Sequence, residues 1–106
     1  MIAERRRLVT TNYVLAELHA LLLARVGRRI ALTVILDLIA SETTMVRVGE
    51  DEERRALEIL RTYADKDFTF VDATSFAVME RLGITQAFTF DRHFGQYGFQ
   101  VVRAAE

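Results

Sequence analysis

The chain has 106 residues, which is enough for one domain. Its formal net charge is −1, so it lacks the overall positive charge of proteins that coat nucleic acids. Hydrophobic residues make up 51% of it and charged residues 27%, which is typical of a globular protein and excludes a disordered one. There is no cysteine, which excludes disulfides, thiolate metal sites and thiol nucleophiles.

The first half of the sequence predicts a short extended segment followed by two helices. Residues 8–10 favour an extended conformation, and Thr11 or Asn12 can cap a helix over residues 13–26. A second helix is predicted over residues 29–40, because its apolar residues recur at helical spacing.

The second half alternates strands with helices. In chain order these are a strand over 44–48, a helix over 50–64, a helix over 71–82, and strands over 87–90 and 99–102 separated by a glycine-containing loop. Strands that alternate with helices indicate an α/β fold with a mainly parallel sheet covered on both sides. In such sheets ligands gather at the carboxyl ends of the strands.

Glu17 lies on a helix that is otherwise almost entirely apolar. Within residues 14–24 only Glu17 and His19 are polar, so we expect this helix to be buried. A buried carboxylate is costly unless it is paired or binds a metal. We interpret Glu17 as a ligand, with an ion pair to an arginine as the alternative, and His19 as a core or boundary residue.

Two further acids stand where elements begin or end. Asp72 comes three residues after Thr69 at a helix start, which on its own indicates a capping box, yet it enters an apolar helix. Asp91 directly follows the predicted strand over 87–90 and is expected at the carboxyl edge of the sheet. An Asx turn into the next residues is the alternative for Asp91.

Several carboxylates that converge with few bases form a hard-oxygen site suited to Mg²⁺ or Mn²⁺. Such an ion can acidify a water, orient it for in-line attack and neutralise charge on a phosphate oxygen. Glu17, Asp72 and Asp91 are therefore the candidate metal ligands and catalytic residues.

Charge is distributed unevenly along the chain. Residues 1–36 hold six arginines and two glutamates, a balance of +4, and residues 37–106 hold eight bases and thirteen acids, a balance of −5. A basic region beside an acidic one could bind a polyanion and also hold cations; surface charge that segregates without a function is the alternative. The longest apolar stretch, residues 14–24, is too short to span a membrane, so we expect a cytoplasmic protein.

Three blocks of sequence resemble PIN-domain proteins of the VapC type. They are TTNYVLAE at 10–17, DKDFTFVDATSFAVM at 65–79, and AFTFDRHF at 87–94 followed by Gly98-Phe99. The resemblance runs across nearly the whole chain. By position, Glu17 matches the second acid of the family, Asp72 the third and Asp91 the fourth, and Ser75 matches a small polar position one turn along the same helix.

The resemblance implies a PIN-like three-layer α/β/α fold with a mainly parallel sheet and a site of four acids around Mg²⁺ or Mn²⁺. It further implies endoribonuclease activity, often on tRNA or rRNA, together with a cognate antitoxin partner and commonly a homodimer. In the family, an opening strand ends in the first aspartate, before the block that here begins near Leu8. We therefore expect residues 1–106 to be a single PIN-like domain that is N-terminally incomplete and missing its first strand; Glu4, in a charged segment, is no substitute for that aspartate.

The leading hypothesis is a metal-dependent endoribonuclease, the toxin of a VapBC-like pair. Its weaker candidates for contacts to the RNA backbone are Arg25, Arg28, Arg29 and Arg92. The alternative is a catalytically incomplete PIN-like domain that acts only in self-association or antitoxin binding. A generic α/β domain that binds a small molecule is a third hypothesis.

Overall fold

The structure is a computed structural model that describes residues 8–89 and 91–102. The chain divides into two compact units, with the boundary between Arg47 and Val48, and each unit is described by itself. No helix among the described residues has both the length and the apolar character needed to cross a lipid bilayer.

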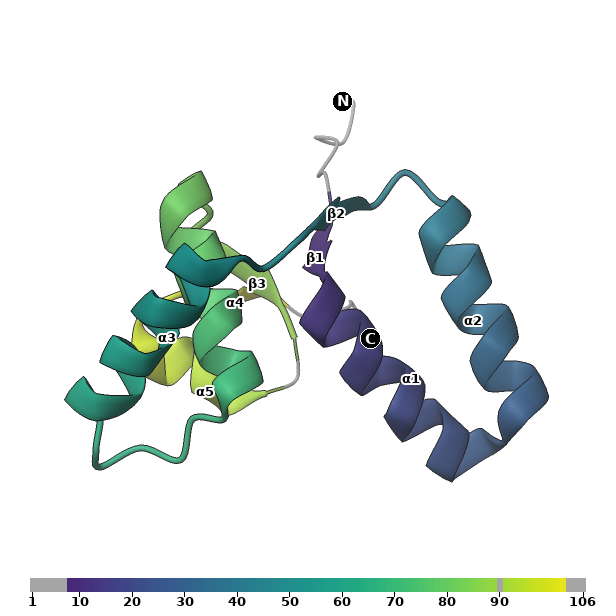
Figure 1. Ribbon diagram of the computed structural model, residues 1–106, viewed down its shortest axis with the longest axis horizontal. Coiled ribbons are helices and arrows are strands. Elements are labelled where there is room, and N and C mark those ends of the chain that lie inside the picture. The colour runs from purple at the N-terminus through teal and green to yellow at the C-terminus, as the bar shows by residue number, and fades with distance from the viewer. Residues whose placement is uncertain (1–7, 90, 103–106) are drawn as a thin grey trace. The chain divides into compact units, whose positions relative to one another are not determined.

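The described residues of the first unit form two helices and a pair of short parallel strands. Its elements are β1 (Val9–Thr11), α1 (Asn12–Val26), α2 (Arg28–Ala40) and β2 (Thr44–Val46). The side chain of Thr11 accepts a 3.1 Å hydrogen bond from the backbone of Val14, so Thr11 is the helix cap. The two helices form a hairpin that turns at Gly27 (Figure 1).

The first unit buries few side chains. Among its described residues only Thr11 and Ala31 are buried, and none of the residues of α1 is. The prediction of a buried α1 is therefore wrong. Within this unit α1 contacts α2 and β1, which cover only part of its surface. An apolar composition favours burial but does not show that other elements cover the whole helix.

In the second unit, the part of the chain that the structure describes forms three helices and another pair of parallel strands. Its elements are α3 (Glu50–Thr62), α4 (Phe70–Leu82), β3 (Gln86–Phe88), α5 (Arg92–Tyr97) and β4 (Gln100–Val102). Helices α3 and α4 pack against each other. In the β3–β4 pair, Gln86 lies opposite Gln100 and Phe88 opposite Val102.

Helix α5 occupies the segment that was predicted to be a loop. Asp91 caps its first turn, and Gly98 ends it with a positive φ of 123°, a conformation that suits glycine. Phe94 and Tyr97, three residues apart on the helix, pack against the core of the unit. Because α5 has six residues and only two of them pack on the core, its hydrophobic periodicity is too weak to predict a helix.

The core of the second unit is aromatic. Phe76 is fully buried, and its ring stacks on Tyr97 at 4.5 Å and meets Phe94 edge-on at 5.0 Å between centroids. Ile59 of α3 is fully buried in the same cluster, and Phe68 packs edge-on against Phe76. These contacts hold α3, α4 and α5 together.

The predicted α/β class and the parallel pairing of strands are confirmed. All predicted helices are present within a few residues of their expected ends. The described strands have three residues each and form two two-stranded sheets, one in each unit. Phe90, the expected end of the third strand, lies outside the described residues.

Candidate metal centre

A reciprocal capping box fixes Asp72 at the start of α4. The backbone N–H of Asp72 donates to Oγ1 of Thr69 at 3.0 Å, and the backbone N–H of Thr69 donates to Oδ2 of Asp72, also at 3.0 Å. Both bonds satisfy backbone groups that a helix start leaves without intrahelical partners. The predicted capping role of Asp72 is therefore confirmed, and it leaves the second carboxylate oxygen outside the box.

Asp72 is also buried. The residue is 8% exposed, and the helix that follows it is closely packed, with Ala73 and Phe76 completely buried. A carboxylate in such surroundings needs donors or a cation to offset its lost hydration. One donor is His93, whose Nδ1 lies 2.8 Å from Oδ2 of Asp72.

Asp91 caps the short helix α5. Its Oδ1 accepts the backbone N–H of His93 at 2.9 Å, and its own N–H donates to Oγ1 of Thr89 at 2.9 Å. This is the Asx geometry weighed as the alternative for this residue. The cap does not exclude a second role, since the side chain of Asp91 is 41% exposed.

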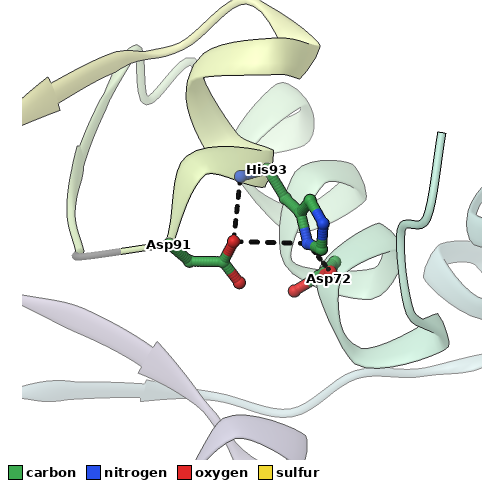
Figure 2. A group of neighbouring side chains, drawn as sticks. All are labelled: Asp72, Asp91 and His93. Atoms are coloured by element: carbon green, nitrogen blue, oxygen red, sulfur yellow. Dashed lines mark hydrogen bonds and ion pairs between the residues drawn. The ribbon is translucent and has the colours of Figure 1, made fainter.

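The structure brings Asp72, Asp91 and His93 together (Figure 2). One potential ligand atom of each lies within 4.8 Å of those of the other two. Of the three acids predicted to converge, Glu17, Asp72 and Asp91, the structure brings the two aspartates together. The sequence pattern did not single out His93, whose only signal was its place two residues after Asp91 in the AFTFDRHF block.

The other predicted residues of the second unit lie on the same elements. Ser75 is 7% exposed and follows Asp72 by three residues on α4, which places both on one side of the helix. Arg92 is exposed and occupies the first turn of α5, directly after Asp91.

The remaining predicted residues belong to the first unit. Glu17 is exposed on α1, and Arg25 is exposed in its last turn. Arg28 and Arg29 are exposed in the first turn of α2. Because Glu17 lies in a different unit from Asp72, its role as a ligand beside that residue stays a prediction.

The cluster in the second unit fits a divalent cation. Two carboxylates supply hard oxygen donors of the kind that Mg²⁺ and Mn²⁺ prefer, and an imidazole nitrogen suits transition metals. Each aspartate uses one oxygen in the contacts described above, Oδ2 for Asp72 and Oδ1 for Asp91, and the second oxygen of each takes no part in them. Two carboxylates this close repel each other when ionised, and a cation removes that repulsion.

Comparison with known proteins connects this geometry to a family. The family model described as PIN domain matches residues 1–100 of the chain. The chain is 39% identical over 95 residues to the 23S rRNA-specific endonuclease VapC20 of two Mycobacterium tuberculosis strains, CDC 1551 and H37Rv. These matches cover 90% of the chain and 72% of each relative.

A solved structure is similar over the same extent. It is the crystal structure of Mycobacterium tuberculosis VapC20, described as a Sarcin-Ricin loop cleaving toxin. The TM-score is 0.84 at 36% sequence identity, and the match covers 91% of this chain and 74% of that one. The resemblance drawn from the three sequence blocks is confirmed.

Proposed function

The chain belongs to the PIN-domain family, as an endoribonuclease of the VapC toxin type, and we propose that it works with a divalent metal ion, Mg²⁺ or Mn²⁺, held by Glu17, Asp72 and Asp91. One observation carries the proposal: Asp72 and Asp91, far apart in the sequence, place their carboxylates in one cluster. Each aspartate also makes a hydrogen bond that caps its own helix, but capping alone would not bring the two carboxylates together.

When bound, the ion supplies Lewis-acid stabilisation of the phosphate and a more acidic water at the scissile bond. The chain supplies the carboxylates, each oriented by a backbone N–H at its own helix start: that of Thr69 for Asp72 and that of His93 for Asp91. Ser75, a turn beyond Asp72, is the supporting polar residue in this proposal.

Four exposed arginines, one in the second unit and three in the first, are the proposed contacts to RNA. Arg92 is exposed next to Asp91, and Arg25, Arg28 and Arg29 flank the turn of the α1–α2 hairpin. Guanidinium groups bind phosphate oxygens with paired hydrogen bonds, which positions a backbone without reading its sequence. We propose ribosomal RNA as the substrate, and the sarcin–ricin loop of 23S rRNA as the first RNA to test, because the similar proteins are described as acting there.

An antitoxin and self-association are the proposed protein partners, in the cytoplasm. Support comes from the α1–α2 hairpin, which leaves large apolar side chains exposed, among them Leu21, Leu23, Ile30, Leu36 and Ile39 at 47–57%. Exposed apolar clusters of this kind are typical of surfaces that a protein partner covers.

The test is cleavage of a sarcin–ricin loop oligonucleotide by the full chain with Mn²⁺. The variants Asp72→Asn, Asp91→Asn and Glu17→Gln each remove one negative charge with little change of shape. We expect each to lower the cleavage rate by about 100-fold or more, since even residues that only orient metal ligands are worth roughly 10- to 100-fold. Chelation of the metal should abolish cleavage.

Asp65→Asn is the matched control. Asp65 lies in the loop between α3 and α4, its side chain is 77% exposed, and its recorded ion pair is with the adjacent Lys66. Its substitution should leave cleavage unchanged. Cleavage that persists undiminished in both Glu17→Gln and Asp72→Asn contradicts the proposal. A chain that associates with itself but neither cleaves RNA nor binds Mn²⁺ fits the catalytically incomplete domain instead.

A further inference from the structure

We propose that His93 is a positioning residue that ties Asp72 to Asp91 through one oxygen of each and leaves the other oxygen of each for the metal. This inference rests on the metal site of the proposed function and deepens it. It gives a role to the side chain of His93, whose position beside both aspartates is explained neither by helix capping nor by phosphate binding.

The ring nitrogen Nδ1 of His93 contacts both carboxylates. It lies 2.8 Å from Oδ2 of Asp72 and 3.2 Å from Oδ1 of Asp91 (Figure 2). Because an ionised carboxylate can only accept hydrogen bonds, Nδ1 must carry the hydrogen in this arrangement. This N–H group therefore donates to the acid at the start of α4, and its nitrogen lies within ion-pair distance of the acid at the start of α5.

The backbone donors fall on the same two oxygens. Oδ2 of Asp72 also accepts the N–H of Thr69, and Oδ1 of Asp91 also accepts the backbone N–H of His93. Each carboxylate oxygen offers about two lone-pair sites, so Oδ2 of Asp72 is fully used by two hydrogen bonds, and Oδ1 of Asp91 accepts one hydrogen bond with Nδ1 of His93 beside it. The other oxygens, Oδ1 of Asp72 and Oδ2 of Asp91, are the ones left to coordinate a cation.

The imidazole is itself held in place, as a positioning residue must be. The side chain of His93 is 15% exposed, and its ring meets the ring of Phe68 edge-on at 5.5 Å. Phe68 is 7% exposed and belongs to the aromatic core. The core therefore sets the orientation of the ring, and the ring sets the separation of the two carboxylates.

Direct coordination by His93 is the competing role. Coordination through Nδ1 would require that nitrogen to lose its hydrogen and would break both contacts to the carboxylates. The observed geometry instead matches the outer-shell hydrogen bonds that fix metal-binding carboxylates, and loss of such bonds typically weakens metal affinity.

Mn²⁺ binding by the full chain tests the inference, measured by calorimetry on three variants. His93→Ala removes the N–H group, His93→Asn keeps an N–H donor close to the position of Nδ1, and His19→Asn makes the same chemical change at the other histidine. We expect His93→Ala to weaken Mn²⁺ binding by about 10- to 100-fold. His93→Asn should recover most of the affinity, and His19→Asn should bind as the unsubstituted chain does.

Pulsed electron paramagnetic resonance of the Mn²⁺ complex separates the two roles of His93. We expect no coupling from a directly coordinated nitrogen in the unsubstituted chain. Such a coupling, unchanged affinity in His93→Ala, or equal losses in His93→Ala and His93→Asn would each overturn the inference while leaving the metal site intact. If the unsubstituted chain binds no Mn²⁺, the proposed metal site fails, and the inference fails with it.

Discussion

The hydroxyl of Tyr97 donates a 2.6 Å hydrogen bond to Oε2 of Glu80. Arg55 reaches the same carboxylate, with Nε 3.0 Å from Oε1 and Nη2 3.3 Å from Oε2. The three residues come from α5, α4 and α3 respectively, so one polar network joins side chains of these helices. This network gives two predictions about how stability depends on pH.

Replacing Arg55 by methionine should destabilise the second unit at neutral pH. The hydrogen bond from Arg55 is the main cause that lowers the pKa of Glu80 below its ordinary 4.5, against an opposing effect of burial. A carboxylate with a lowered pKa stabilises the fold above its unfolded pKa and loses that contribution as the pH falls. Because both side chains are more than a third exposed, we expect a loss of about 1 kcal/mol, the upper end for solvent-screened pairs.

Urea unfolding at pH 7 and pH 4 measures this effect. The difference between Arg55→Met and the unsubstituted chain should shrink at the lower pH. Arg54→Met is the control, because Arg54 pairs with Asp51 at 67% and 89% side-chain exposure. That substitution should change the unfolding free energy by less than about 0.5 kcal/mol. Equal losses in both variants would contradict a special role for the Arg55–Glu80 pair.

Tyr97 should ionise later than an ordinary tyrosine. Burial, reinforced by the hydrogen bond to Glu80, raises the pKa of Tyr97 from 10.0 to about 12. The unfolded chain therefore loses this proton at lower pH than the folded chain, so the unfolding free energy should fall as the pH rises from about 10 to about 12. Tyrosinate absorbance followed against pH should contain a late component that Tyr97→Phe removes.

Phe76→Ala should come close to unfolding the second unit. The ring is completely buried and contacts the rings of Phe68, Phe94, Tyr97 and Phe99. Removing a buried phenylalanine costs about 3–5 kcal/mol, which is a large part of the roughly 5–15 kcal/mol that stabilises a typical domain. Phe88→Ala is the control, since Phe88 is 62% exposed. Denaturant midpoints compare the two, and a midpoint for Phe76→Ala near that of Phe88→Ala would show that this ring is not the centre of the core.

Gly83→Ala should destabilise the fold, whereas Gly95→Ala should stabilise it. Gly83 ends α4 in the left-handed conformation, with φ 70° and ψ 25°, and an added Cβ would meet nothing within 4 Å. Gly83→Ala should therefore lower the free energy of unfolding by about 1 kcal/mol, because alanine disfavours the left-handed backbone conformation. Gly95 lies inside α5, and its Cβ would sit 3.5 Å from Val101, an ordinary contact, so alanine there should stabilise by about 0.4–1 kcal/mol. Thermal melting of both variants checks the signs; a stabilised Gly83→Ala would exclude strain at that helix end.

The parts of the structure that sequence could predict depend on local patterns. The capping box of Asp72 is one, because Thr69 and Asp72 are three residues apart and their types define the motif. The role of His93 could not be predicted in that way, since its closest partner, Asp72, is 21 residues away. Helix α5 was missed because it is short, and α1 was wrongly expected to be buried because apolar composition does not reveal what covers a helix.

The double use of Asp72 has a consequence for anyone who engineers this domain for heat tolerance. Glutamate is the more usual partner in a capping box, so Asp72→Glu would keep the bond to the N–H of Thr69 and pass a screen based on melting temperature alone. The extra methylene would nevertheless shift Oδ1, the oxygen that we propose coordinates the metal. A melting temperature does not report the position of this oxygen, so under the proposed metal site variants at residue 72 also need a measurement of Mn²⁺ affinity.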